Sequence, residues 1–443
     1  MIQFYSTLSG KKEQLKPLKA QNISLYVCGI TPYDNAHIGH GRVFVTFDLL
    51  YRLLTFIGYH VNYCRNVTDI DDKLLTKAQK EFGDPLRYHE VAQRYTASFN
   101  RDMKALNCAT PTHEPLVTQN MPEIITFIQE LIAKNKAYKV NGDVYYRIAQ
   151  FPAYGKLSKQ KLDELRAGAR VQINEEKEDP LDFALWKSEK ENTFWHSPWG
   201  WGRPGWHIEC SALAKKYLAE QIDMHGGGAD LTFPHHENEI AQTEGLTEKR
   251  FAQLWLHCAF VNVNKEKMSK SLGNFFTLND TFGEFDPMTI RYYYLTHYYR
   301  TPLDFSFDDI KSAQKAYQKI CHYFSDVAPQ QFDLASLKKI DAIVRMLSFL
   351  EDDLNSPGMF GVLFTFMQEK HDAQTKAAMK YFIREVLGLT LEPLPEKLVT
   401  ITPEIQQLLD EREQARKAKD FKRADDIREQ LRIMGVDLHD KKM

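Results

Sequence analysis

The sequence lacks any long apolar stretch. Nowhere in its 443 residues does an apolar run reach the roughly 18 residues that a membrane-spanning helix needs. The first residues, MIQFYSTLSGKKEQLKP, have no apolar core of the kind that a secretion signal requires. We therefore expect a cytoplasmic chain with no membrane partner.

Closely spaced cysteines are also missing. The six cysteines stand far apart in the sequence, at positions 28, 64, 108, 210, 258 and 321. This spacing excludes a CxxC redox pair and argues against a disulfide framework. Most of these side chains are expected to be buried thiols.

A strong net charge is the third absence. The chain has 57 Lys and Arg against 59 Asp and Glu, which gives a formal net charge of −2. The chain as a whole therefore does not attract nucleic acid, and any such partner must be bound by a local basic surface. The length is sufficient for about three domains.

The stretch YVCGITPYDNAHIGHGR at 26–42 is the most informative part of the sequence. Residues 23–28 read as a strand, and apolar positions 43, 47, 50, 54 and 57 follow the spacing of a helix face. A strand that leads through glycine into a helix N-terminus presents free N–H groups and a positive dipole end, which suits a polyphosphate. His37 and His40 stand at this helix entrance, where Gly39 leaves room for a flat ring. Two ordinary surface histidines before a helix are the alternative.

A second cationic segment lies far downstream. Lys267-Met-Ser-Lys270-Ser is followed by Leu-Gly-Asn, which is typical of a mobile loop. Its two ammonium groups could reach a phosphate chain from the opposite side. The two segments together favour a nucleotide site.

The order strand, helix, strand at the start of the chain predicts a parallel sheet. The second strand spans 60–66, and ligands of such sheets bind at the carboxyl ends of the strands. Thr68 falls at such an end. It could equally cap a helix over 71–82, and the two roles are compatible. The Asn141-Gly142 turn then predicts a hairpin, and this change to β-rich sequence marks an insertion at roughly 115–205.

Four side chains from three segments form a candidate metal site. Cys210 falls in the first turn of a helix that starts near His207, where the positive helix end favours a thiolate; an ordinary buried cysteine is the alternative. In HGGGADLTFPHHENEIAQ, His235 and Glu239 are four residues apart and so share one helix face. With Cys28 they complete a set of two sulfurs, one nitrogen and one oxygen that zinc accepts.

His236 is the competing ligand, but it should face about 100° away around the helix and contact neighbouring side chains or nucleotide. A zinc ion beside the phosphate-binding loop could bind a substrate thiol as thiolate, which indicates cysteine as the substrate. A serine hydroxyl is a harder ligand with a far higher pKa, so the metal itself could reject serine.

The sequence resembles the cysteinyl-tRNA synthetases, a family of class I aminoacyl-tRNA synthetases. The resemblance covers the whole chain and rests on HIGH at 37–40, KMSKS at 267–271, GRPGWHIECS at 202–211 and the segment at 225–242. It implies an α/β fold with a Rossmann-type catalytic core at 1–114 and 206–250 and a connective insertion at 115–205. It also implies a stem-contact region with the KMSKS loop at 251–307, a helical bundle at 308–400 and an anticodon-binding module at 401–443.

The resemblance also implies roles for individual residues. One zinc ion per chain is held by Cys28, Cys210, His235 and Glu239. ATP with Mg²⁺ is contacted by His37, Gly39, His40, Asp230, Lys267 and Lys270, of which Lys270 is the stronger candidate of the two lysines, whereas Thr68 and Trp206 line the amino-acid pocket. Cys258 departs from the expected pattern, and we interpret it as a packing residue and not as a fifth ligand.

The C-terminal third reads as helical. Residues 291–300, RYYYLTHYYR, could be a base-stacking platform, but their helical spacing favours packing. Helices are predicted near 308–327, 337–354, 358–369 and 372–387, followed by two charged helices over 403–434. The charge of this last segment alone predicts only an exposed helical hairpin.

The activity implied by the resemblance is attachment of L-cysteine to tRNA(Cys) through a cysteinyl-adenylate, by a chain that we expect to be a monomer. One alternative is a ligase that joins activated cysteine to an aminosugar, which has no need of the segment after 400. The other is a non-catalytic protein that binds zinc and RNA, for which the complete HIGH and KMSKS sequences would have no purpose.

We predict that Lys270→Ala slows adenylate formation by about 100-fold or more, because an oriented charge at the transition state contributes on that scale. The measurement is cysteine-dependent exchange of pyrophosphate into ATP. An unchanged exchange rate would refute this role for Lys270.

Overall fold

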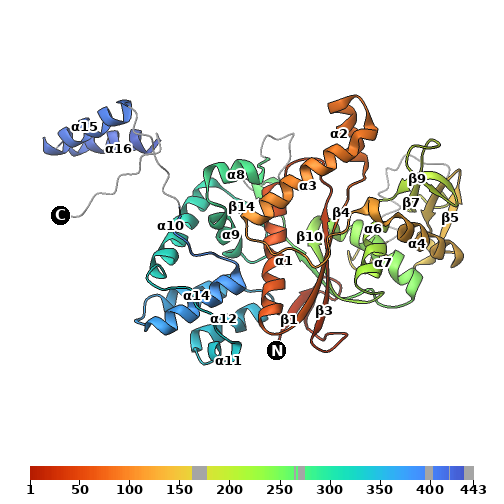
Figure 1. Cartoon of the computed structure of the whole chain (residues 1–443), viewed down its shortest axis with the longest axis horizontal. Coiled ribbons are helices and arrows are strands. Elements are labelled where there is room, and N and C mark those ends of the chain that lie inside the picture. Colours follow the sequence, from red (N-terminus) through yellow and green to blue (C-terminus); the bar gives the residue numbers. More distant parts are fainter. Residues whose placement is uncertain (162–176, 264–265, 268–274, 395–402, 419, 434–443) are drawn as a thin grey trace. The chain divides into compact units, whose positions relative to one another are not determined.

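The computed structural model describes residues 1–161, 177–263, 266–267, 275–394, 403–418 and 420–433 (Figure 1). The chain divides into two compact units, Met1–Pro393 and Leu394–Met443. No helix of the described residues is both long enough and apolar enough to cross a membrane.

A four-stranded sheet forms the centre of the first unit. Its order is β11 (Ala252–Cys258), β10 (Ile222–Gly228), β3 (Asn22–Ile30), β4 (His60–Val67), and all neighbouring strands are parallel. Helix α1 (Ile38–Phe56) connects β3 to β4, so the predicted strand, helix, strand unit and the α/β class are confirmed. β11 lies in this sheet although it follows residue 250, where we expected the core to end.

The pairing of β3 with β4 is irregular at Cys28. Val27 pairs with Arg65 and Ile30 with Val67, so the register shifts across Cys28 and Gly29. Such a bulge bends a strand locally and changes the direction of its side chains. A Cβ on Gly29 would lie 1.6 Å from the carbonyl oxygen of Asn66. Only glycine therefore allows the two strands to approach this closely beside Cys28.

The N-terminus of the helix that follows β4 is capped by Asp71 and not by Thr68. Asp71 caps α2 (Asp72–Phe82) by accepting a hydrogen bond from the backbone N–H of Lys73 at 2.8 Å. The suggestion that Thr68 caps this helix is therefore wrong, because an aspartate one residue before the helix supplies the oxygen. A short turn, η1 (Pro85–Arg87), connects α2 to α3 (Tyr88–Ala105).

The predicted insertion contains a second sheet, which is antiparallel. Its order is β5 (Ala137–Val140), β6 (Asp143–Tyr146), β7 (Phe183–Ser188), β9 (Gly200–Pro204), β8 (Trp195–Ser197). Asn141 and Gly142 both have positive φ and close the predicted hairpin. The other elements that pack here are η2 (Val117–Asn120), α4 (Met121–Ala133), η3 (Ile148–Gln150) and α6 (Ile208–Tyr217).

Two further segments complete the surroundings of the sheet. η4 (Ala229–Thr232) and α7 (His235–Thr247) connect β10 to β11, and a hairpin of β1 (Gln3–Ser6) and β2 (Lys11–Gln14) packs at β11. A three-stranded sheet has the order β13 (Glu266–Lys267), β12 (Val261–Val263), β14 (Leu303–Phe305).

The helical part of the first unit packs against α1, on the side of the sheet away from the insertion (Figure 1). Its helices are α8 (Leu278–Glu284), α9 (Pro287–Leu295), α10 (Phe307–Tyr323), α11 (Leu334–Leu337), α12 (Asp341–Glu351), α13 (Ser356–Phe366) and α14 (Ala373–Leu387). Buried Arg291 on α9 forms an ion pair with Asp48 of α1 and donates to the carbonyl of Leu387 at 2.7 Å. Tyr292–Tyr294 are buried, so the aromatic run packs as its spacing predicted.

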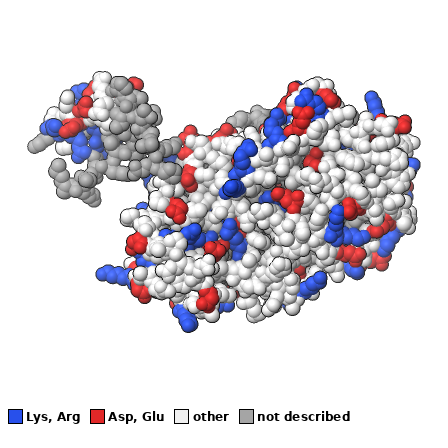
Figure 2. Space-filling model, viewed as in Figure 1, with Lys and Arg blue, Asp and Glu red and all other residues white. Residues whose placement is uncertain are grey.

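The second unit is a helical hairpin of α15 (Pro403–Lys417) and α16 (Phe421–Ile433), as predicted. Ala415, Ala424, Ile427 and Leu431 are buried along its seam. On the face of the chain shown in Figure 2, basic and acidic side chains are interspersed, as the near-zero net charge leads one to expect.

We predict that Gly29→Ala lowers the free energy of unfolding by about 1–3 kcal/mol or more, because the new methyl group overlaps the Asn66 carbonyl. Gly283→Ala is the matched control: a Cβ at this position of α8 meets no atom within 4 Å, and alanine should stabilise the helix by up to about 1 kcal/mol. Denaturant titration of both variants measures the difference. A Gly29→Ala variant as stable as the parent would contradict the close packing at the bulge.

Candidate functional site

One cavity of about 330 Å³ lies at the carboxyl ends of the parallel strands. Ile30, Gly228 and Cys258, the last residues of β3, β10 and β11, line it. This is the place where parallel α/β sheets bind ligands. Nine of the predicted site residues line the same cavity: Cys28, His37, Gly39, His40, Thr68, Trp206, Cys210, Asp230 and His235.

His37 and His40 cap α1 reciprocally. The backbone N–H of His40 donates to Nδ1 of His37 at 3.3 Å, and the backbone N–H of His37 donates to Nδ1 of His40 at 3.2 Å. The two rings stack with their centroids 3.7 Å apart. Burial lowers the pKa of His40 well below its usual value, and the charges of His37 and Lys73 lower it further. A neutral ring that accepts at Nδ1 carries its proton on Nε2, which is then a donor.

Of the second cationic segment, 267–271, the structure describes Lys267. Lys267 belongs to β13, which pairs antiparallel with β12. Lys270 lies outside the described residues, as does the rest of the segment 268–271. The predicted contacts of these lysines with ATP stay predictions.

The structure brings the four predicted metal ligands together. Their ligand atoms all lie within 4.8 Å of one another, and all four side chains are buried. Cys28 Sγ is 3.8 Å from Cys210 Sγ and 3.4 Å from Oε1 of Glu239. Nε2 of His235 is 3.5 Å from Cys210 Sγ and 3.2 Å from Oε1 of Glu239. A tetrahedral zinc site requires ligand separations of roughly 3.3–3.8 Å, so the set fits this ion.

The protonation states of these four side chains also favour a metal ion at this place. Burial raises the pKa of both thiols, that of Cys210 to about 12. Burial also lowers the pKa of His235 well below its usual value, which leaves a neutral imidazole with a free lone pair. Nδ1 of His235 lies 2.9 Å from Nδ1 of His207, which fixes the ring orientation. Two buried thiols become thiolates here only if a cation is present.

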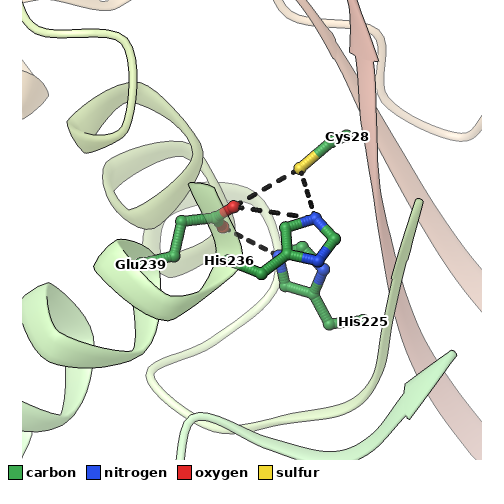
Figure 3. Close-up of side chains that lie close together, drawn as sticks. All are labelled: Cys28, His225, His236 and Glu239. Carbon is green, nitrogen blue, oxygen red and sulfur yellow. Dashed lines mark hydrogen bonds and ion pairs between the residues drawn. The ribbon is translucent and has the colours of Figure 1, made fainter. Parts of the chain in front are cut away.

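A second set of possible ligands shares two members with the first. Cys28, His225, His236 and Glu239 also lie within 4.8 Å of one another (Figure 3). His225 Nε2 is 2.8 Å from Oε2 of Glu239, and His236 Nε2 is 3.3 Å from Cys28 Sγ. Neither His225 nor His236 lines the cavity. The set with Cys210 and His235 is therefore the one that a substrate could reach.

The structure corrects the prediction for His236 in part. We expected its ring to turn away from the metal ligands, yet it contacts Cys28, and its Nδ1 lies 2.8 Å from Nε2 of His257. The rotation along α7 does separate it from His235, because the two ring centroids are 5.7 Å apart. His236 contacts side chains, as predicted, and is fully buried.

The remaining predicted residues surround the cavity. The Trp206 ring is 40% exposed and lies 4.4 Å from the ring of His235, centroid to centroid. Asp230 is in η4, directly after β10. Thr68 is buried and donates to Oε1 of Glu209 at 2.5 Å. Cys258 lies 3.5 Å from Oγ1 of Thr46 and belongs to neither candidate metal set of the described residues.

Sequence reasoning missed Glu209, a carboxylate that lines the cavity although it is only 1% exposed. Burial raises the pKa of its carboxyl well above the usual range, the hydrogen bond from Thr68 offsets this in part, and the charges of Asp71, Asp69 and Glu239 add to it. Its neighbour Cys210 was recognised from ligand chemistry. A lone glutamate in a first helical turn gives no comparable signal, because helices commonly have acidic residues there.

Two family models match the chain. Residues 14–315 match the model for the catalytic domain of tRNA synthetases class I (C), and residues 399–443 match the anticodon binding domain of cysteinyl-tRNA ligase. Among solved structures, Mycobacterium tuberculosis methionyl-tRNA synthetase with methionyl-adenylate covers 86% of this chain over 94% of its own length, with a TM-score of 0.56 and 13% identity. The ternary complex of Agrobacterium radiobacter K84 agnB2 LeuRS with tRNA and LeuAMS has a TM-score of 0.59, 11% identity and 85% coverage of both chains. These two structures support the fold.

Curated relatives are far more similar in sequence. The cysteine–tRNA ligase of Geobacter sulfurreducens is 42% identical over 99% of this chain and 98% of its own. That of Geobacillus thermodenitrificans is 43% identical over 99% of this chain and 97% of its own. With the class I catalytic-domain match and the arrangement of the cavity, these similarities show that the chain belongs to the cysteine–tRNA ligase family of class I aminoacyl-tRNA synthetases.

Proposed function

We propose that this chain attaches L-cysteine to tRNA(Cys) with ATP, through a cysteinyl-adenylate, and that one zinc ion binds the thiol of the amino acid. One observation carries the proposal: three of the four candidate metal ligands, Cys28, Cys210 and His235, line the same cavity as the two α1 histidines. A thiol-binding centre and a phosphate-binding centre thus face the same space.

In the first step, the carboxylate of cysteine attacks the α-phosphate of ATP and pyrophosphate leaves. The N-terminus of α1 and the imidazole donors of His37 and His40 would bind the phosphates and stabilise the charge that develops on phosphorus. Lys267 and Lys270 would approach from the other side, and Asp230 and Gly39 would contact the nucleoside. Mg²⁺ would accompany ATP. These groups position the reactants, and the step needs no protein general base.

The amino-acid pocket would be formed by Thr68, Trp206 and the metal ligands. Cys28, Cys210, His235 and Glu239 would hold zinc, which supplies a soft cation for the sulfur of the substrate. Because Cys28, Cys210 and His235 line the cavity, a substrate sulfur could approach the bound ion from that side. A hydroxyl in the same place is a weaker ligand, so serine would be bound far more weakly than cysteine.

In the second step, the activated cysteine would pass to the 2′-OH of the terminal adenosine of the tRNA. The match of residues 399–443 to an anticodon-binding domain supports tRNA as the acceptor over an aminosugar. The five-part division given by the sequence, a monomeric state and a cytoplasmic location belong to the same proposal.

The decisive experiment is cysteine-dependent exchange of pyrophosphate into ATP, followed by a charging assay that offers tRNA(Cys) or an aminosugar as acceptor. We predict exchange with cysteine and transfer to tRNA(Cys) alone. Transfer to the aminosugar would favour the alternative ligase. Absence of any exchange would leave a binding protein as the better description.

The metal site has a matched test of its own. Cys210→Ser removes one sulfur ligand, so we predict that zinc affinity falls by more than the roughly 10–100-fold that loss of an outer-shell partner costs. Cys258→Ser is the control, because Cys258 is buried at the same cavity but lies outside the ligand set. Metal analysis after dialysis against a competing chelator measures both. Equal retention of zinc by the two variants would contradict the assignment.

A further inference from the structure

Glu209 occupies an unusual position in the cavity. It stands next to the metal ligand Cys210 in the first turn of α6, and its side chain lines the same cavity as Cys28 and His235. The side chain is 1% exposed. Among the described residues its one hydrogen-bond partner is Thr68, and no lysine, arginine or histidine of that part of the chain pairs with it. Buried carboxylates are rarely left without a cation.

A chain of hydrogen bonds fixes which atoms face the cavity. The N–H of Gly29 donates to Oδ1 of Asn66 at 2.9 Å, and Nδ2 of Asn66 donates to the hydroxyl of Thr68 at 3.2 Å. The Thr68 hydroxyl then donates its single proton to Glu209. With that proton committed, the Thr68 oxygen can only accept from a ligand, and the Glu209 carboxyl, held by Thr68, presents its oxygens in the same cavity.

Other acidic groups lie near this pair. Burial raises the pKa of Glu209, and the charges of Asp71, Asp69 and Glu239 raise it further. Asp69 is itself committed to Thr118, whose N–H and hydroxyl donate to it at 2.9 and 2.5 Å. Asp71 accepts the capping hydrogen bond of α2. Glu209 is thus the acidic group of this cluster that lines the cavity.

The proposed substrate has a cation at the right spacing. In cysteine the sulfur and the ammonium nitrogen are separated by three bonds, which places them roughly 3–4 Å apart by ordinary bond lengths. An ammonium group has three donors and no acceptor. With its sulfur at the ligand set, the amino acid would place its ammonium a few ångströms from Cys28 and Cys210, in the cavity that Thr68 and Glu209 also line.

We propose that Glu209, held by Thr68, binds the α-ammonium group of the substrate amino acid. This inference rests on the proposed function and adds a second determinant of substrate choice beside the thiol. The site accepts a thiol that has a neighbouring ammonium and disfavours one without it. The carboxylate side of the amino acid remains turned towards the phosphates, as adenylate formation requires.

Three small thiols, used as test ligands, distinguish ammonium binding by Glu209 from a purely structural role of this residue. L-Cysteine has both an ammonium and a carboxylate, cysteamine has only the ammonium, and 3-mercaptopropionate has only the carboxylate. Their binding to the zinc-loaded chain is measured by calorimetry. Glu209→Gln should weaken cysteine and cysteamine by about 10–100-fold, the usual contribution of a hydrogen bond to a charged group. Binding of 3-mercaptopropionate should change by less than about twofold.

Two further variants serve as a control and as a substitute for Glu209→Gln. Glu237→Gln is the matched control: Glu237 is equally buried, accepts from the backbone N–H groups of Leu157 and Ser158, and does not line the cavity. It should leave the affinity ratio of cysteamine to 3-mercaptopropionate unchanged. Thr68→Val retains the shape of the side chain and should lower the same ratio. It serves as the test variant if Glu209→Gln fails to fold.

Each outcome decides the question. An unchanged ratio in both Glu209→Gln and Thr68→Val overturns the inference, and so does equal weakening of all three thiols. If the parent chain exchanges pyrophosphate with cysteine but the ratio does not move, the inference alone fails. If the parent chain shows no exchange with cysteine, the proposed function fails as well.

Discussion

Two buried thiols, an imidazole and a carboxylate meet at one point in this fold, in an arrangement suited to a cation. Without one, burial keeps the thiols protonated, and the carboxylate of Glu239 lies among the rings of His225, His235 and His236. The four ligands come from β3, α6 and α7, which are separated by up to 211 residues of sequence. Binding of one ion therefore links the first strand of the sheet to the helices that enclose the cavity.

The same strand end serves both halves of the chemistry. Cys28 turns towards the metal ligands at the register shift of β3, and the chain then continues to His37 and His40 at the start of α1. The close approach of Gly29 to Asn66 holds β3 against β4, and Asn66 in turn positions Thr68. A small displacement at Gly29 would consequently move the candidate metal ligand Cys28, the start of α1 and the Thr68 hydroxyl together.

Periodicity and ligand chemistry predicted the parallel sheet, the helix boundaries to within a few residues and the four side chains that cluster as candidate metal ligands. These features are local or depend on residue type: a helix face repeats every three or four residues, and a cysteine, a histidine and a glutamate are recognisable as ligands wherever they stand. The contact of His236 with Cys28 and the position of Glu209 were not predictable in the same way. Both depend on how separate elements approach each other in space, and the register shift that directs Cys28 has no sequence signal beyond one glycine.

The charges of the cavity add an argument for the ammonium site. With a divalent ion bound, two thiolates and the carboxylate of Glu239 would carry three negative charges, of which the ion compensates two. A substrate sulfur entering as thiolate would raise the excess again, in a cavity that Glu209 also lines. A thiol alone would therefore meet repulsion, whereas a thiol with its own ammonium would supply a compensating positive charge. On the proposed assignment, the metal and Glu209 would thus select for cysteine through two different groups of one small molecule, its thiol and its ammonium.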